Sequence, residues 1–228
     1  MPNQRITFGE WLPDQPSVTG ALVKAENVYS RAVGYGGIPS AVDYSGAASE
    51  NLNNVVAGRN PDGTVTIFAG SATNLYKLDA NDMSLDDVSG ATYTTDATGR
   101  WRFTQFGNRL IAANGKDKLQ GWLLGTASAW ADLAADAPKA KFVTVVRDFV
   151  VSANIYDATT PLPFRVKWSA LNDETSWTDS ATTQSDYQEI PDGGTVVGIT
   201  GGEFGLILMD RSIYRMTYVG SPLVFPFN

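Results

Sequence analysis

The chain has no cysteine and no histidine among its 228 residues. This absence excludes disulfide bonds, thiolate nucleophiles, imidazole general bases and metal sites built on cysteine or histidine. The phosphate-binding patterns G-x-G-x-x-G and G-x-x-x-x-G-K-S/T are also missing, as is the G-x-S-x-G pattern of serine hydrolases. The sequence therefore predicts a protein that is not an enzyme and that holds no cofactor or metal.

Charge is sparse and unbalanced. Charged residues make up 18% of the chain, and the formal net charge is −7. Strong binding to nucleic acid depends on lysine and arginine neutralising phosphates, so a surface that grips DNA is not expected. An acidic wall would let a duplex slide past without sticking, and the same charge also simply keeps a protein in solution.

Long hydrophobic runs are absent as well. Residues Met1–Trp11 contain no apolar run of signal-peptide length, and the apolar stretches elsewhere are no longer than strands. We therefore predict no signal peptide and no membrane segment. The expected location is the cytoplasm of the cell that makes the protein.

What the chain does contain is a pattern repeated four times: a short apolar strand, a tight polar turn, and two further strands. Each unit is followed by a looser fourth stretch. The predicted strands are 54–59, 64–70 and 74–78; 101–106, 109–114 and 119–124; 141–146, 149–154 and 165–170; and 195–200, 205–209 and 213–219. A four-strand unit recurring at this spacing is typical of radially stacked β-sheets. We predict an all-β fold, a β-propeller-like array of about four antiparallel four-stranded blades, over residues 49–228, either open or continued by further chain.

The connections between the strands support this interpretation. Asn60–Gly63 is a strong hairpin signal because Asp-Gly tolerates a left-handed backbone. Residues 107–108, 147–148 and 201–203 occupy the corresponding positions in the other units. The proline-containing stretch Ile155–Phe164 and the polar stretch Asn172–Tyr187 are predicted to be surface loops, and Asp79–Asp87 a solvated loop between units rather than a calcium site.

Residues 1–48 differ from the rest. They carry four prolines, a glycine cluster at residues 34–37 and few alternating runs, which together indicate an extended N-terminal arm. Residues 26–32 are compatible with either a short helical turn or a strand. Nothing near Trp11 in the sequence looks able to bury it, so it is a natural interface anchor. We predict an oligomer interface at Phe8, Trp11, Leu12 and Pro13.

The apolar end of the chain belongs to the same prediction. Residues 222–228 would form an adhesive strand edge if left uncovered, so either further chain or a neighbouring subunit is expected to cover Phe225 and Phe227.

The sequence is also compatible with two kinds of carbohydrate site. Paired carboxylates could act in a propeller glycosidase, and exposed tryptophans could bind sugar. Carboxylates at turns are usually turn formers, and tryptophans in β-repeats usually fill cores, so both are secondary interpretations. The loop carboxylates are Asp148, Asp173, Glu174, Glu203 and Asp210, and the tryptophans are Trp11, Trp101, Trp122, Trp130, Trp168 and Trp177.

Several phrases together resemble a known group of proteins. They are ITFGEWLPD at residues 6–14, WRFTQFGN at 101–108, VVRDFVV at 145–151, VKWSA at 166–170 and DRSIYRMTYVG at 210–220. They are similar to stretches of tailed-bacteriophage tail proteins, namely the propeller-containing hub or nozzle proteins of short podovirus tails, also called packaged-DNA stabilisation proteins.

This resemblance implies a structural virion protein, assembled in the host cytoplasm. Copies would form a homo-oligomeric ring, with a hexamer favoured, that extends the DNA-ejection channel. The ring would dock an adaptor, fibres and a plug or needle, and DNA would pass through it without sticking. Another head-tail or fibre-attachment adaptor, and a carbohydrate-binding propeller or glycosidase, remain alternatives.

Overall fold

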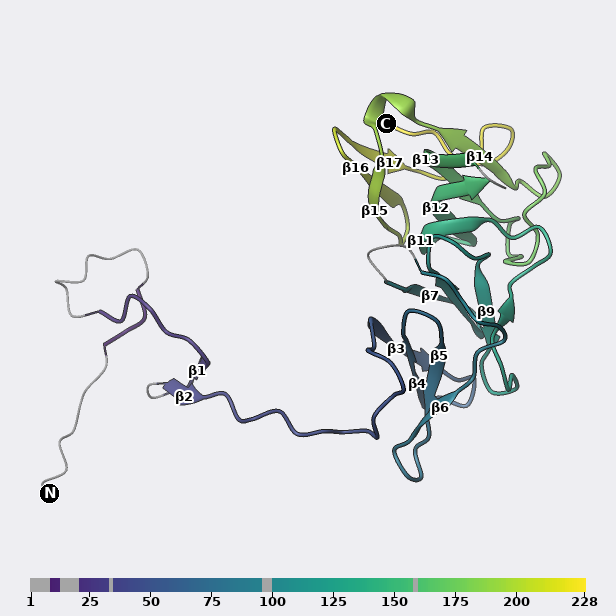
Figure 1. Ribbon diagram of the computed structural model, residues 1–228. Helices are drawn as coiled ribbons and strands as arrows, with labels where there is room; N and C mark the ends of the chain where they lie inside the picture. Colours follow the sequence, from purple (N-terminus) through teal and green to yellow (C-terminus); the bar gives the residue numbers. More distant parts are fainter. Residues whose placement is uncertain (1–8, 13–20, 33–34, 96–99, 158–159) are drawn as a thin grey trace, which may run out of the picture. The chain divides into compact units, whose positions relative to one another are not determined.

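The computed structural model describes residues 9–12, 21–32, 35–95, 100–157 and 160–228 (Figure 1). The chain divides into two compact units, Met1–Tyr44 and Ser45–Asn228. The boundary therefore precedes the expected one at residue 48. The reason is that residues 45–50 pack on the first sheet: the Gly46 amide donates to the Met83 carbonyl over 2.8 Å, and the Ser49 and Tyr76 hydroxyls are hydrogen-bonded over 2.7 Å.

The first unit contains one short antiparallel hairpin. Strand β1 (Val28–Ser30) pairs with β2 (Tyr35–Gly37). An isolated parallel bridge joins Trp11 to Leu22. Residues 26–32 were compatible with a helical turn or a strand, and the structure shows the strand β1.

The second unit consists of four antiparallel sheets, in each of which strands that follow one another in sequence are neighbours. The first sheet contains β3 (Asn54–Arg59), β4 (Val65–Gly70), β5 (Leu75–Leu78) and β6 (Leu85–Asp87). The second contains β7 (Arg102–Phe106), β8 (Arg109–Ala113), β9 (Gln120–Leu123) and β10 (Ala131–Asp132). The third contains β11 (Lys139–Val146), β12 (Phe149–Asp157), β13 (Thr160–Trp168) and β14 (Asp186–Glu189). The fourth contains β15 (Val196–Thr200), β16 (Gly205–Met209) and β17 (Ile213–Met216), preceded by the 3-10 turn η2 (Pro191–Gly193).

The sheets follow one another in sequence order through the unit (Figure 1), and each packs on the next. Three hydrophobic cores separate them, one for each pair of consecutive sheets. Phe68, Leu75, Leu110 and Trp122 are in the first core, Ile111, Ala113, Val143 and Val150 in the second, and Phe142, Trp168, Ile207 and Met216 in the third. The all-β, propeller-like array predicted from the sequence is confirmed.

The C-terminal residues take the place of a fourth strand in the fourth sheet. An isolated bridge pairs Met216 with Phe227. The Arg215 amide donates to the Asn228 carbonyl over 2.8 Å, and the Asn228 amide donates back to Arg215 over 3.1 Å. The outer edge of β17 is thus paired by the end of the same chain, which satisfies backbone groups that would otherwise remain open.

The first turn of each sheet lies at the residues predicted from the sequence. In the first sheet, the Gly63 amide donates to the Asn60 carbonyl over 2.9 Å, and Gly63 has φ +86°. The Asp62 carboxylate accepts hydrogen bonds from the amide and the hydroxyl of Thr64. In the third sheet, Arg147 adopts a φ of +50° without being glycine.

The surface loop predicted over Ile155–Phe164 is wrong, because strands β12 and β13 continue through it as a long hairpin. Tyr156 pairs with Pro161 and Ile155 with Leu162. Strand β14 pairs only with residues 165–168, so the proline-containing part of β13 has a neighbour on one side alone. Proline lacks an amide donor and is tolerated at such an edge.

Two other loop predictions need correction. Asp79–Asp87 is not a connection between units, because it contains the turn between β5 and β6 and strand β6 itself. The Asp79 and Asp82 carboxylates accept amide hydrogen bonds from Asn81 and Ser84 and so stabilise that turn. The stretch Asn172–Tyr187 is mostly turns, but its last two residues belong to β14.

Among the described residues, no helix has the length and apolar character needed to cross a membrane.

Candidate interaction surfaces

Two of the predicted arm residues can be placed, and both expose their side chains. Trp11 is 51% exposed, and Leu12 is also exposed. Their backbones are held within the first unit: the Trp11 amide donates to the Tyr35 hydroxyl and the Leu12 amide to the Leu22 carbonyl. Phe8 and Pro13 lie outside the described residues. The interface assignment itself stays a prediction.

The same unit exposes apolar side chains that sequence reasoning did not single out. Ile38, Val42 and Tyr44 are all exposed. They lie between β2 and the second unit, in a stretch without apolar periodicity, so the sequence offered no signal to separate them from core residues. With Trp11 and Leu12, they are exposed apolar side chains of the first unit.

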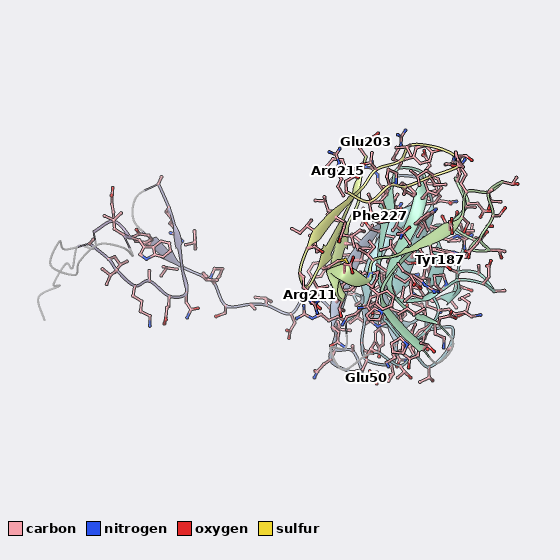
Figure 2. The ribbon with its side chains drawn as sticks, turned by 90° about the horizontal axis from the view of Figure 1, so that it is seen from above. Glu50, Tyr187, Glu203, Arg211, Arg215 and Phe227 are labelled. Carbon is pink, nitrogen blue, oxygen red and sulfur yellow. The ribbon has the colours of Figure 1, made fainter. Side chains whose placement is uncertain are left out.

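The C-terminal part of the interface prediction is corrected by the structure. Phe225 is only 3% exposed, and its ring lies 5.0 Å from Phe149 and 5.2 Å from Trp168, centroid to centroid. Phe227, labelled in Figure 2, is partly buried against the same core and pairs with Met216. The chain itself covers this stretch, so Phe225 has no surface to offer to a neighbour.

The tryptophans of the repeat region fill cores. The side chains of Trp101, Trp122, Trp130, Trp168 and Trp177 are all buried. They are therefore not available as a platform on which sugar rings stack. Trp11 is the one exposed tryptophan.

Several of the loop carboxylates accept hydrogen bonds or form ion pairs within the protein. Asp173 accepts hydrogen bonds from the amide and hydroxyl of Thr175, and Asp210 from the Thr195 amide. Glu203 forms an ion pair with Arg147 at 3.3 Å. For Asp148 the described contact is through its backbone carbonyl, which accepts from the Asn172 amide over 2.9 Å.

Five carboxyl groups of the described residues have a pKa that departs from its ordinary value, and in all five the pKa is lowered. Hydrogen bonds from Thr73 and Ser71 lower the pKa of Glu50, and hydrogen bonds from Thr64 lower that of Asp62. The other carboxyls with a resolved shift, Asp82, Asp87 and Asp136, also have a lowered pKa. A general acid requires the opposite shift, because it must keep its proton near neutral pH.

A cleft of about 480 Å³ lies where β7, β11 and β15 come together. Arg100, Arg102 and Lys141 line it, and none of the described lining residues is acidic. The guanidinium of Arg102 lies 5.5 Å from the centre of the Phe142 ring. Three basic side chains therefore gather at this cleft, although the chain as a whole is acidic.

The second and third sheets are joined by a polar contact as well as by their core. Arg109 on β8 donates to the Glu174 carboxylate over 2.7 Å, and both side chains are largely buried. Asp136, between β10 and β11, accepts from the Trp177 amide over 3.1 Å and from the Thr178 hydroxyl over 2.8 Å. The turn after β13 is thereby tied to the second sheet.

Asp136 gives this contact a pH dependence. Burial acts to raise the pKa of Asp136, but the hydrogen bonds from Thr178 and Trp177 outweigh it, and the net shift is downwards. A lowered folded-state pKa stabilises the fold above the unfolded value, about 3.9 for aspartate, and this contribution is lost as the pH falls through the folded value.

We expect Asp136→Asn to lower the free energy of unfolding at pH 7 by less than about 1 kcal/mol, because the carboxyl is well solvated. At pH 2 the difference from the wild type should shrink towards zero. Urea unfolding at the two pH values measures both quantities. A difference that is equal at pH 7 and pH 2 would contradict the role given to the charge.

Comparisons with known proteins find similarity among solved structures. No protein-family model matches the chain, and no curated protein does. Among solved structures, the "Crystal structure of the computationally designed Ika4 protein" is similar with a TM-score of 0.45 and 13% identity, over 75% of this chain and 93% of that one.

Proposed function

We propose that the chain is a structural virion protein of a bacteriophage tail, of the hub or nozzle type. Copies assemble into a ring, with a hexamer favoured, that extends the DNA-ejection channel and docks an adaptor, fibres and a plug or needle. The proposal rests on the resemblance of residues 6–14, 101–108 and 210–220 to such proteins. In this role the β-sheet array is scaffolding, and residues 1–44 hold neighbouring copies.

The observation that best supports an assembly role is the exposure of apolar groups on the first unit. Trp11 and Leu12 are exposed although their backbones are hydrogen-bonded within the unit. Tryptophan is strongly enriched among residues that dominate binding energy at protein interfaces. A fixed backbone that presents Trp11 loses less conformational freedom on binding than a free segment would.

Deleting residues 1–44 tests the proposal. We expect the remaining chain to keep the far-ultraviolet circular dichroism of a β protein, because all three cores lie in residues 45–228. We also expect rings seen by negative-stain electron microscopy of the full chain to disappear. Rings that persist at unchanged protein concentration would contradict the arm's role.

A point substitution refines the test. Trp11→Ala should weaken ring formation by about 30-fold or more, since interface tryptophans often contribute at least 2 kcal/mol. Tyr187→Ala is the matched control, because Tyr187 is an exposed aromatic residue of the second unit (Figure 2).

The position of the protein in the virion separates a hub from another head-tail or fibre-attachment adaptor. Electron microscopy of particles that carry a tagged copy would show that position.

A further inference from the structure

The inner sheets of the second unit bury both faces. Leu110 and Trp122 of the second sheet lie in the core shared with the first sheet, whereas Ile111 and Ala113 lie in the core shared with the third. Successive side chains of a strand point to opposite faces, so β8 contributes to two cores. The first and fourth sheets have a neighbour in sequence on one face only.

The free face of the first sheet carries mainly aliphatic side chains, with Arg59 opposite Val65 at one end. Val56 and Phe68 are paired across β3 and β4 and belong to the core with the second sheet. The alternate residues of β3 and β4 point to the opposite face of the sheet. Ala57 pairs with Ile67 on that face, and Val55 and Val65 lie on it as well. Val55 is 57% exposed and Val65 is 60% exposed. We call Val55, Ala57, Val65 and Ile67 the first-sheet outer face.

The chain covers only the far part of this side. Tyr76 on β5 is buried, and its hydroxyl is hydrogen-bonded to Ser49. The exposed aliphatic part of this side is therefore on β3 and β4.

The free face of the fourth sheet is also aliphatic. Ile207 and Met209 of β16 are buried against the third sheet, so Leu206 and Leu208 point to the opposite side. Leu208 pairs with Ile213, and these side chains are 37% and 66% exposed. We call Leu206, Leu208 and Ile213 the fourth-sheet outer face. Arg215, labelled in Figure 2, shares this side, and its guanidinium lies 4.2 Å from the centre of the Phe204 ring.

Antiparallel sheets with one solvated face usually alternate apolar residues inside with polar residues outside. Both outer faces break this rule, and contiguous exposed apolar side chains commonly mark an interaction site. Each face is also the surface that the next sheet of the array would cover. By the same sheet-on-sheet packing, the fourth-sheet outer face would be covered by a sheet whose first two strands carry an aliphatic face. The first sheet carries such a face on β3 and β4.

We propose that the fourth-sheet outer face of one copy packs on the first-sheet outer face of a second copy, so that the array of sheets continues from one chain into the next. The main sheet-to-sheet contacts among the described residues join consecutive sheets, which leaves Val55, Val65 and Ile213 exposed in a single chain. A second copy supplies the missing partner of both faces. The junction is head-to-tail, and it does not rest on the proposed tail function or on the arm.

The test uses three variants of the full chain. Leu208→Asp blocks the fourth-sheet outer face, and Val55→Asp blocks the first-sheet outer face. Both positions are exposed in the single chain, so the substitutions should leave the fold intact, which circular dichroism and thermal unfolding check. Leu223→Asp is the matched control, because Leu223 is exposed and lies outside both faces.

Sedimentation velocity at tens of micromolar gives the readout. We expect the wild type and Leu223→Asp to sediment as species of more than one chain. Leu208→Asp and Val55→Asp should each sediment more slowly than the wild type, with the dissociation constant of the head-to-tail junction raised about 100-fold, because each places a carboxylate in a contact between aliphatic side chains.

Mixing the two blocked variants is the decisive step. Leu208→Asp keeps an intact first-sheet face, and Val55→Asp keeps an intact fourth-sheet face, so an equimolar mixture should recover a species larger than either variant forms alone. Recovery would support the head-to-tail junction. A wild type that is a single chain, association of both blocked variants at wild-type strength, or a mixture no larger than the separate variants would each overturn the proposal. Association of both blocked variants through residues 1–44 would leave the tail function standing.

Discussion

Replacing Trp101 by alanine should lower the free energy of unfolding by about 4 kcal/mol, as measured by urea denaturation. The side chain is fully buried in the core between the first and second sheets. Its ring makes an edge contact with Tyr93 at 5.1 Å between centroids. Its indole N–H donates to the Ser71 carbonyl over 2.8 Å. Alanine would leave a large cavity and a buried carbonyl without its donor.

Two companion variants separate the contributions. Trp101→Phe keeps most of the packing but loses the hydrogen bond to Ser71, and should cost about 2 kcal/mol. Trp11→Ala makes the same substitution at an exposed tryptophan, and should change the stability of the single chain by less than about 0.5 kcal/mol. Equal effects of Trp101→Ala and Trp11→Ala would show that the core between the first two sheets is misplaced.

The second large effect is expected at Gly201, in the turn between β15 and β16. A Cβ atom built on Gly201 would lie 1.8 Å from the Val145 carbonyl oxygen of β11, too close for any real contact. The two segments are held together there by backbone hydrogen bonds. The Gly202 amide donates to Val145 over 3.0 Å, and the Arg147 amide donates to Gly202 over 2.8 Å. The Val145 carbonyl belongs to the backbone of β11, which cannot move aside as a flexible side chain can.

We therefore expect Gly201→Ala to lower the free energy of unfolding by about 3 kcal/mol, through overpacking and the loss of these two hydrogen bonds. Gly107→Ala is the control. Gly107 also sits in a turn, with φ +55°, but nothing lies within 4 Å of its added Cβ. It should cost about 1 kcal/mol, from backbone strain alone. If Gly201→Ala were no more destabilising than Gly107→Ala, the close approach of the third and fourth sheets would be wrong.

Much of the local structure was accessible from the sequence. The predicted strand 54–59 has the same bounds as β3, and 205–209 has those of β16. Alternating apolar residues and turn residues act over a few positions, so they can be read without knowing the rest of the fold. The proline-containing hairpin of β12 and β13 was missed. Proline is unfavourable in a strand that is paired on both sides but tolerated in an edge segment, and the sequence does not show that β14 leaves this part of β13 unpaired on one side.

The candidate surfaces were less accessible. Trp11 stood out because its surroundings were poor in apolar periodicity, and it is exposed in the structure. Phe225 was assigned to the interface because an uncovered apolar strand would be adhesive. That prediction is wrong, because Phe225 is buried against Phe149 and Trp168, which are distant in sequence. The two outer faces gave no signal at all. Val55 and Ile213 look like core residues, and only the position of their sheets leaves them exposed.

The sequence by itself determined the strand repeats, most of the turns and the narrow range of chemistry open to a chain without cysteine or histidine. These follow from residue types and from neighbours in the chain. Only the tertiary structure decided which sheet faces are covered, that residues 226–228 pair with β17 and that the basic groups of β7 and β11 meet in one cleft. Those outcomes depend on packing between residues far apart in sequence, and the spacing of apolar residues does not record which partner each face meets.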